Sequence, residues 1–533
     1  MEQRNLILAF ALSMLILLGW GMLFPPAENT GPIASSENSA AVAPAAENVA
    51  APDPRPEPED VYPSAPGEPS SPPLKTTAMN DNVITFGNNL LKLSVDEKGR
   101  VVSATLNQYR EGLEKGAALV PVLGEDDPRA SYLSVGIMGE KGVSPFKLVS
   151  KESVNGADRV VLRAALTDGR LWDRIITLTP DSYIISMNDR VQNGADTKLF
   201  RQVVERYPDH DVSNFYEHAG PVGLMDDILQ QESYDDLDES GTVRLAATGG
   251  WTGTMSRYFI TAMYGNQKRD YRYYYKGDGR SYQSGMIDDG VMEGSTAVFE
   301  SSVFIGPKLI PLLQEPGVGL ERSIDYGWFA FISKPLHDAL SWLYKYFPNY
   351  GVCIILLVIG IKIIFYYPTQ KSYESMAAMR KLQPEQKRLQ DRYGDDRQQL
   401  GQEMMALYKK NKVNPLGGCL PIIIQIPVFF ALYKVLLMSI EMRQAPFMGW
   451  IQDLSVQDPY FVLPLLMGAS MYIQQKLNPQ PIDPMQAKLM SFLPALFTVM
   501  FLFFPAGLVL YWVVNNILAI VQQRLVMKNM GVD

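Results

Sequence analysis

The stretch LFTVMFLFFPAGLVLYWVVNNILAIV, residues 496–521, decides the fold class of this chain. It carries no charged residue. A tight turn at Pro505-Ala506-Gly507 separates two apolar segments, 489–504 and 507–524, whose facing parts make up this stretch. Apolar segments of this kind are typical of membrane-spanning helices, and a turn this short pairs them as neighbours. We therefore predict a polytopic α-helical membrane protein.

Four further apolar segments lie upstream. The first, Leu6–Phe24, follows Arg4 and is followed by Pro25 without a small-residue cleavage site, which predicts an uncleaved N-terminal anchor over 1–24. Several of the six segments hold only 16–18 residues, roughly 24–27 Å of helix. They are short for a hydrocarbon core of about 30 Å, so a locally thinned bilayer is expected. The remaining three are 350–367, 419–438 and 459–475.

Basic residues set the expected orientation. Loop 369–418 carries ten Lys/Arg against six acids, loop 476–488 and the C-terminal tail are also basic, and loop 439–458 has only Arg443. Because basic residues concentrate on the cytosolic side, both termini are predicted to be cytosolic. Residues 25–349 then lie outside, which is the periplasm if the cell has one.

The part of the chain before the membrane half differs in charge. Residues 1–325 carry a net charge of −16 and residues 326–533 a net charge of +7, an asymmetry that favours two compartments. Residues 25–78 hold 13 prolines and are predicted to be an extended linker. Trp, Tyr and apolar residues at helical spacing over 326–349 predict an amphipathic helix in the membrane interface, with a soluble core helix as the alternative.

Residues 79–325 are predicted to form short strands. Apolar and polar residues alternate over Leu91–Asp96, and a hairpin is expected from Val160–Leu166 through the turn at Asp168-Gly169 to Ile175–Leu178. Many such strands joined by Gly/Asp turns predict a large antiparallel β-sandwich, which the topology places in the periplasm.

Several function classes are excluded by missing motifs. The chain has no phosphate-binding loop, no zinc-protease motif and no serine-hydrolase elbow. Its three histidines are scattered, and its two cysteines, Cys353 and Cys419, show no metal-ligand spacing. We therefore expect no enzyme activity, no cofactor and no metal.

Polar residues inside the apolar segments are the candidate site. Lys362 and Gln425 each lie roughly 8–9 Å in from the cytosolic end of a segment, and a cation facing lipid at that depth is costly. A shared wet cavity would accept a hydrophilic, acidic stretch of polypeptide; snorkelling of Lys362 and a helix–helix hydrogen bond of Gln425 remain open alternatives. Further candidates for its lining are Thr498, Tyr511, Trp512, Asn515 and Asn516.

The cytosolic loop 369–418 is the second candidate site. It is predicted to form two helices, Ser372–Arg392 and Asp395–Lys412. Methionine surfaces adapt to varied apolar partners, and a basic face suits ribosomal RNA or anionic lipid. An ordinary hairpin that packs on itself is the alternative. The expected contact residues are Met376, Met379, Arg380, Met404 and Met405.

Ordered motifs run through the membrane half and resemble the YidC family of membrane protein insertases. The anchor, the linker and the β domain match the Gram-negative form of that family, so the resemblance covers essentially the whole chain. The motifs are MRKLQP (379–384), EMMALYK (403–409), KVNPLGGC (412–419), IQIP (424–427), RQAPF (443–447), DPMQ (483–486) and PAGLVLYW (505–512).

The resemblance implies a five-helix insertase core, 350–533, with a hydrophilic groove open to the cytosol, and a periplasmic β-supersandwich. It implies nascent membrane proteins as clients, delivered by ribosomes and the signal recognition particle, and work alone or beside the Sec translocon, with no DNA partner. Lys362 falls where the family usually has an arginine, and Gln425 and Trp512 fall on other groove positions. A lysine keeps the positive charge but lacks the bidentate fork.

Two other functions remain to be weighed. A small-solute transporter would normally show internal repeats or several paired intramembrane charges, and neither is evident. A periplasmic assembly chaperone would place the main activity in the β domain. Deleting residues 30–315 separates these readings, because an insertase core should remain active without them.

Overall fold

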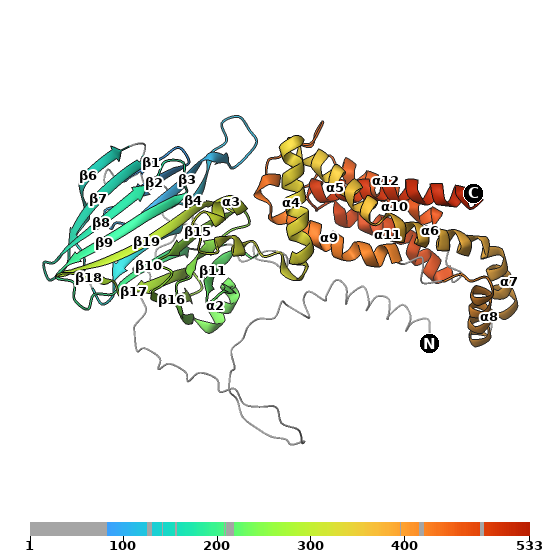
Figure 1. Cartoon of the computed structure of the whole chain (residues 1–533), viewed down its shortest axis with the longest axis horizontal. Coiled ribbons are helices and arrows are strands. Elements are labelled where there is room, and N and C mark those ends of the chain that lie inside the picture. The colour runs from blue at the N-terminus through green and yellow to red at the C-terminus, as the bar shows by residue number, and fades with distance from the viewer. Residues whose placement is uncertain are drawn as a thin grey trace, which may run out of the picture. The chain divides into compact units, whose positions relative to one another are not determined.

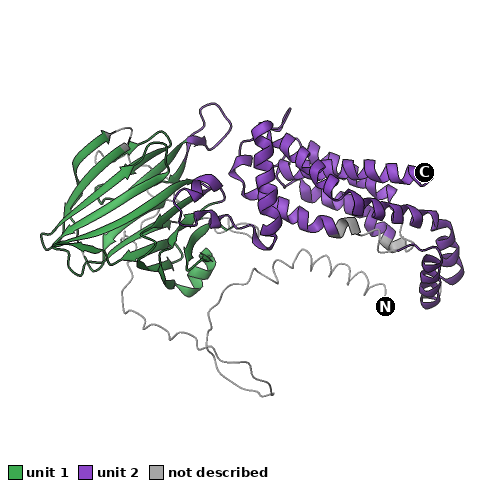
Figure 2. Ribbon diagram, viewed as in Figure 1, with its two compact units in different colours: residues 1–107, 121–256, 260–306 green, residues 108–120, 257–259, 307–533 purple. Residues whose placement is uncertain are grey.

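The computed structural model describes residues 83–124, 131–140, 142–154, 157–206, 208, 218–394, 396–414, 420–479 and 484–532. The predicted anchor 1–24, the linker 25–78 and the motif residues 415–419 and Asp483 lie outside the described residues. The chain divides into two compact units (Figure 2). Unit 1 comprises 1–107, 121–256 and 260–306, and unit 2 comprises 108–120, 257–259 and 307–533.

Two large antiparallel sheets account for unit 1 (Figure 1), which confirms the predicted β-sandwich. One sheet has the order β1 (Ile84–Gly87), β2 (Leu91–Val95), β3 (Val101–Arg110), β5 (Ser131–Ile137), β10 (Leu199–Arg206), β17 (Ser281–Asp288), β16 (Asp270–Gly277), β13 (Thr242–Thr248), with β4 (Leu119–Leu123) on β3. The other has the order β12 (Ile228–Gln231), β11 (Gly220–Met225), β14 (Trp251–Met255), β15 (Phe259–Tyr264), β19 (Thr296–Pro307), β9 (Ile184–Gln192), β8 (Leu171–Leu178), β7 (Ala157–Ala165), β6 (Lys147–Val154), with β18 (Val291–Glu293) on β19. A short helix, α2 (Tyr234–Ser240), precedes β13.

Alternation of side chains builds these sheets. Along β8, every second residue from Trp172 to Leu178 is buried, and the residues between them are half-buried. The predicted hairpin is present as β7 and β8, with Val160 opposite Ile176. A period of two places one face of the strand in the core, so a slip of one residue would turn the apolar face outward.

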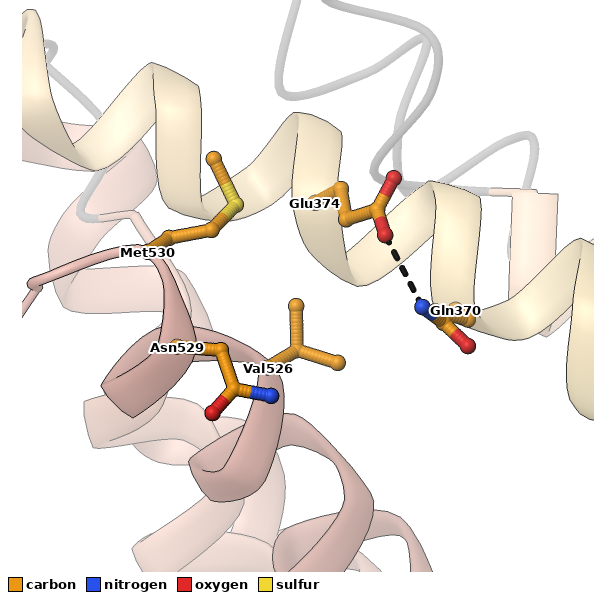
Figure 3. Close-up of a pocket in the computed structure, with 5 residues that line it drawn as sticks. All are labelled: Gln370, Glu374, Val526, Asn529 and Met530. Atoms are coloured by element: carbon orange, nitrogen blue, oxygen red, sulfur yellow. Dashed lines mark hydrogen bonds between the residues drawn. The ribbon is translucent and has the colours of Figure 1, made fainter.

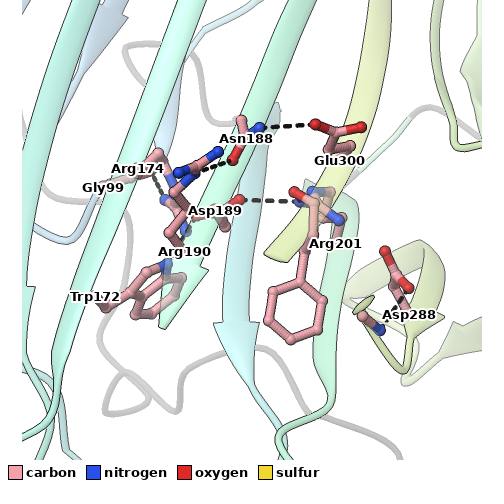
Figure 4. A network of polar contacts seen from close by, with 11 residues as sticks. Gly99, Trp172, Arg174, Asn188, Asp189, Arg190, Arg201, Asp288 and Glu300 are labelled. Carbon is pink, nitrogen blue, oxygen red and sulfur yellow. Dashed lines mark hydrogen bonds and ion pairs between the residues drawn. The ribbon is translucent and has the colours of Figure 1, made fainter. Parts of the chain in front are cut away.

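A buried charge network joins the two sheets (Figure 4). Asp189 on β9 accepts hydrogen bonds from Arg174 Nε on β8 at 2.7 Å and from Arg201 Nη2 on β10, in the other sheet, at 3.0 Å. The Trp172 indole also donates to Asp189, at 2.8 Å. Arg174 donates further to the carbonyl of Gly99, at 2.6 Å. Both arginines and the aspartate are fully buried, so their mutual pairing offsets the cost of removing three charges from water.

Unit 2 is helical. In Figure 1, α4 lies across one end of the long helices, and α7 and α8 lie at the other end, which we call the hairpin end. Helix α12 packs against α5, α6 and α10, and α4 packs against α5 and α9. The helices are α3 (Ile310–Gln314), α4 (Ala330–Tyr346), α5 (Tyr350–Ile364), α6 (Tyr366–Lys381), α7 (Gln383–Tyr393), α8 (Arg397–Lys410), α9 (Leu420–Met438), α10 (Val462–Leu477), α11 (Pro484–Phe501) and α12 (Ala506–Asn529).

Helix length and hydropathy give a partial view of the membrane spans. Among the described residues, α12 alone is long and apolar enough to cross a bilayer by itself. Helices α5 and α6 pass the same test together but bend by 70° where they meet. The apolar parts of α9 and α11, Ile424–Met438 and Ala487–Phe501, are shorter. The count of six spans therefore stays a prediction.

Proline sets two helix boundaries that differ from the expected ones. The segment predicted to run over 350–367 ends as a helix at Ile364, because Pro368 has no N–H to donate to the Ile364 carbonyl and its ring crowds that carbonyl, whereas a proline is tolerated in the first turn of α6. The helix expected over Ser372–Arg392 is divided after Lys381, where Pro384 occupies the first turn of α7. Among its described residues the hairpin beyond α5 therefore contains three helices, where two were predicted.

Candidate functional site

A polar pair links α9 to α12. Gln425 Nε2 on α9 donates a hydrogen bond to the hydroxyl of Tyr511 on α12, which is buried. One turn further along α9, the ring of Phe429 meets Trp512 edge to face, with centroids 4.7 Å apart. The structure thus brings Gln425, Tyr511 and Trp512 together, and the close contact of two apolar helices places the amide where the hydroxyl satisfies it.

Aromatic rings continue from this pair toward the α4 end. Trp512 lies 5.3 Å from Phe501 between ring centroids, and Phe501 lies 5.0 Å from Phe504. Tyr433, two turns beyond Gln425 on α9, lies 6.1 Å from Phe504. The Gln425 amide and the Tyr511 hydroxyl therefore lie on the hairpin side. The cluster of aromatic rings lies between them and the α4 end, and we call it the ring wall: Phe429, Tyr433, Phe501, Phe504 and Trp512. Such a wall resists entry of water and of polar chain from the α4 end.

Lys362 lies in the last turn of α5 and is half-buried. Within the described part of the chain, its ammonium makes no hydrogen bond and no ion pair. The next two residues, Ile363 and Ile364, are largely exposed, as expected for a helix end that meets lipid. A cation without a protein partner in such surroundings is costly unless water or a ligand reaches it.

The other predicted lining residues are arranged differently. Asn516 is buried and donates to the Ser470 hydroxyl on α10, at 3.0 Å. Thr498 donates to the Pro494 carbonyl of its own helix, at 2.6 Å, and its side chain lies against Gly468 of α10. These two residues belong to the seam between α10, α11 and α12. Asn515 is half-buried and has no hydrogen-bond partner among the described residues.

The predicted contact residues of the hairpin divide into two groups. Met376, on α6, is only 8% exposed and packs with Tyr373 and Val526, so it is a core residue of the α6–α12 contact. Arg380 also turns to α12, with Nη1 3.9 Å from Met527 Sδ. Met379 and Met404 are half-buried. On α8, Met405 is 61% exposed and free to contact a partner.

A small cavity between α6 and α12 was not expected from the sequence (Figure 3). It has a volume of about 310 Å³. Gln370 and Glu374 point into it from α6, and Gln370 Nε2 donates to the Glu374 carboxylate at 3.0 Å. The pair at i and i+4 was the only sequence signal available. The cavity is completed from α12 by Val526, Asn529 and Met530.

Comparison with known proteins covers both halves of the chain. Residues 342–532 match the family model described as 60Kd inner membrane protein, and residues 83–339 match the YidC periplasmic domain. A membrane protein insertase YidC from Magnetococcus marinus is 40% identical over 99% of this chain and 99% of its own length. One from Geobacter metallireducens is 37% identical over 100% of this chain and 99% of its own length.

A comparison with solved structures gives a match of low score. An active YidC insertase with its first transmembrane domain resolved covers 83% of this chain and 92% of its own, at 16% identity and a TM-score of 0.37. The membership rests on sequence, because 40% identity to a curated insertase extends over nearly the entire length. This chain belongs to the YidC family of membrane protein insertases.

Proposed function

We propose that this insertase receives the hydrophilic segment of a nascent membrane protein in a groove lined by Lys362, Gln425, Tyr511 and Trp512. The observation that carries the proposal is the hydrogen bond from half-buried Gln425 to buried Tyr511, on the hairpin side of a cluster of aromatic rings. A polar chain entering from the hairpin end meets an amide and a hydroxyl, and the rings stop it before the α4 end.

The charge of Lys362 supports a preference for acidic clients. Its ammonium has no ion-pair partner within the described residues, so a client carboxylate can supply one. Opposite charges attract strongly where water is partly excluded. The client's apolar segment then moves into lipid, and its burial, at about 25 cal/mol per Å² of apolar surface, supplies the free energy. This route requires no nucleotide.

The remaining parts of the proposal concern orientation and partners. We infer six membrane spans, with both termini in the cytosol and the β-sandwich unit in the periplasm, from the concentration of Lys and Arg at the hairpin end. Met405 and the basic face of α7 and α8 are then available to the ribosome and the signal recognition particle. Cooperation with the Sec translocon is proposed from family membership.

The central test is insertion of a single-span client into liposomes that contain only this purified protein, scored by protease protection. Lys362→Arg should insert clients normally, whereas Lys362→Ala should most impair clients with acidic translocated tails. Lys371→Ala is the matched control, because that lysine lies on α6, is exposed and contacts the Tyr367 ring. Equal insertion by all of these variants would remove Lys362 from the mechanism.

A second pair of variants tests the polar pair. Tyr511→Phe keeps the ring and removes the acceptor of the Gln425 amide, so insertion should slow while the protein stays folded. Tyr472→Phe, the same change at an exposed position on α10, should insert at the normal rate. Loss of insertion in both variants would indicate general damage to the bundle.

A further inference from the structure

The connection between α9 and α10 exposes an unusual set of side chains. Across Ser439–Phe461, every residue of which the structure describes, exposed large apolar residues recur; Met448 is 63% exposed and Tyr460 is 68% exposed. Phe503, at the turn between α11 and α12, is 75% exposed. We call this set the end patch: Met448, Trp450, Val456, Tyr460, Phe461 and Phe503.

The charged side chains of the same connection are buried or half-buried. None of its four charged residues is exposed. Glu441 faces His337 of α4, with 3.6 Å between Oε1 and Nε2, and Asp453 accepts from the Ser455 hydroxyl at 2.7 Å. Asp458 is almost completely buried. A loop that faced water would show the opposite pattern, with charges outside and large apolar residues inside. The fourth charged residue of the α9–α10 connection is Arg443.

Asp458 accepts hydrogen bonds from three donors of the connection and of the helix that follows it. Its carboxylate accepts hydrogen bonds from the Trp450 indole at 2.9 Å, from the Tyr460 amide at 3.0 Å and from the Leu463 amide, in the first turn of α10, at 2.7 Å. A negative charge at the start of a helix is also favourable toward the helix dipole. Backbone that satisfies its own donors can lie below the headgroups, where unpaired amides are costly.

The two segments of the end patch are held together. The Ala506 amide donates to the Val456 carbonyl at 2.7 Å, and the Gly507 amide donates to the Leu454 carbonyl at 2.9 Å. The patch also continues into α10, because Leu465 lies one helical turn after Phe461 and is exposed on an apolar helix. The end patch is therefore continuous with a surface of the bundle that faces lipid.

We propose that the end patch is immersed in the interfacial layer of the bilayer. Residues 448–461 and Phe503 would then form a wedge, by which we mean a segment that inserts between lipid headgroups at the start of α10. Trp450 and Tyr460 suit this layer, because each joins an apolar ring to a polar group. The inference concerns lipid contact and holds whether or not the groove acts as proposed above.

The wedge also accounts for the length of α10. Its 16 residues span roughly 24 Å, against a hydrocarbon core of about 30 Å. An immersed end patch extends the apolar surface beyond the first residue of the helix. Interfacial segments bury their apolar side chains about 5–10 Å below the headgroup boundary, which matches the missing length.

Spin labels measure this depth directly. The chain has only two cysteines, so Cys353→Ala with Cys419→Ala gives a background for single labels at Val456→Cys, Tyr460→Cys and Phe503→Cys. The labelled full-length protein is placed in vesicles of phosphatidylethanolamine and phosphatidylglycerol. Collision of each label with oxygen, which concentrates in lipid, is compared with collision with a water-soluble nickel chelate.

Two reference positions calibrate the result. Leu466→Cys, exposed on α10, reports lipid, and Glu293→Cys, whose side chain is 60% exposed on β18, reports water. The three test labels should favour oxygen over nickel as the label at 466 does. Nickel access equal to that at 293 would overturn the proposal. Low access to both reagents would also overturn it, because another protein surface would then cover the patch.

Discussion

Unit 1 and unit 2 both bury polar groups, but the partners of those groups differ between the two units. In the β-sandwich, Asp189 is held between Arg174 and Arg201, and all three are fully buried. In the helical unit, two polar pairs that join long helices are neutral, Asn516 with Ser470 and Gln425 with Tyr511. Arg174 and Arg201 of unit 1 both pair with Asp189, whereas Lys362 of unit 2 has no ion-pair partner among the described residues.

The difference follows from solvent. A domain that folds in water can bury charges if they pair well, and such a network then joins its two sheets. A bundle in lipid gains little from apolar contact between helices, so it relies on close packing of small residues and on neutral hydrogen bonds. The proposed pairing of Lys362 with a client carboxylate would supply the partner that the described residues of the bundle do not. Four experiments probe this contrast, in order of decreasing expected effect.

Asp189→Asn should produce the largest loss of stability. The change leaves Arg174 and Arg201 buried without a compensating charge, which typically costs about 3–5 kcal/mol. The measurement is urea unfolding of the full chain in detergent, followed by fluorescence, to which Trp172 beside Asp189 contributes. Asp289→Asn is the control, since Asp289 pairs with Arg272 at 2.7 Å but is 65% exposed and should cost less than about 1 kcal/mol. Equal losses would show that burial does not matter here.

Gly468→Ala should destabilise unit 2 through packing. A Cβ at this position would overlap Thr498 Oγ1, and overpacking of this kind usually costs about 1–3 kcal/mol. Thermal unfolding in nanodiscs measures it, and Gly360→Ala on α5, where a Cβ meets nothing, should be neutral or slightly stabilising. Thr498→Ala in the Gly468→Ala background should restore part of the stability. No recovery would place the strain elsewhere.

Asn516→Ala should have a smaller effect than either of these. It removes the hydrogen bond to Ser470, and hydrogen bonds between membrane helices average about 0.6 kcal/mol with a maximum near 1.7 kcal/mol. Asn515→Ala, on the same helix and without a described partner, is the comparison in the same thermal assay. A loss above about 3 kcal/mol in the free energy of unfolding would mean that this neutral pair stabilises the protein as much as the charged pairs of unit 1 do.

His337 should give the smallest effect, visible as a dependence on pH. Burial lowers the pKa of His337, but the nearby carboxylates of Glu441 and Asp338 outweigh this effect and raise the pKa above its ordinary value of 6.5. Because the charged imidazole is favoured in the folded state, its stabilisation is complete below about pH 6.5 and is lost as pH rises through the folded pKa.

His337→Gln tests this sign. The difference in melting temperature between the native chain and the variant should be largest in mild acid and should shrink as pH rises. Glu441→Gln should flatten the same dependence, because it removes the carboxylate that faces the ring at 3.6 Å. A difference that grows toward alkaline pH would reverse the inferred role of Glu441.

Much of the fold was predictable from local pattern. The alternation over Leu91–Val95 and the hairpin at Asp168-Gly169 placed β2, β7 and β8, because a period of two is visible in any short window. The apolar run on both sides of Pro505 placed α11 and α12. Pro384 also carried a local signal, since it lies in the first turn of α7, which the predicted helix Ser372–Arg392 merged with α6.

The candidate site was only partly predictable. Gln425 and Trp512 were chosen by depth and by resemblance, and the structure brings them together with Tyr511. Asn516 was placed in the same lining, but five residues along a helix rotate a side chain by roughly 140°, so it faces α10 instead. Met376 appeared suited to clients, yet it is buried against α12. Residue type indicated whether a side chain was polar or adaptable. It did not indicate which neighbouring helix the side chain would contact.

The sequence by itself determined the two-part organisation, the β-sandwich, the apolar helices and membership of the insertase family. These depend on composition, periodicity and ordered motifs, which need no knowledge of distant contacts. Only the tertiary structure decided that Asp189 joins two sheets, that Gln425 meets Tyr511 and that the charges of the α9–α10 connection turn inward. Each of those depends on which residues distant in sequence pack against one another, and that is set by the whole fold.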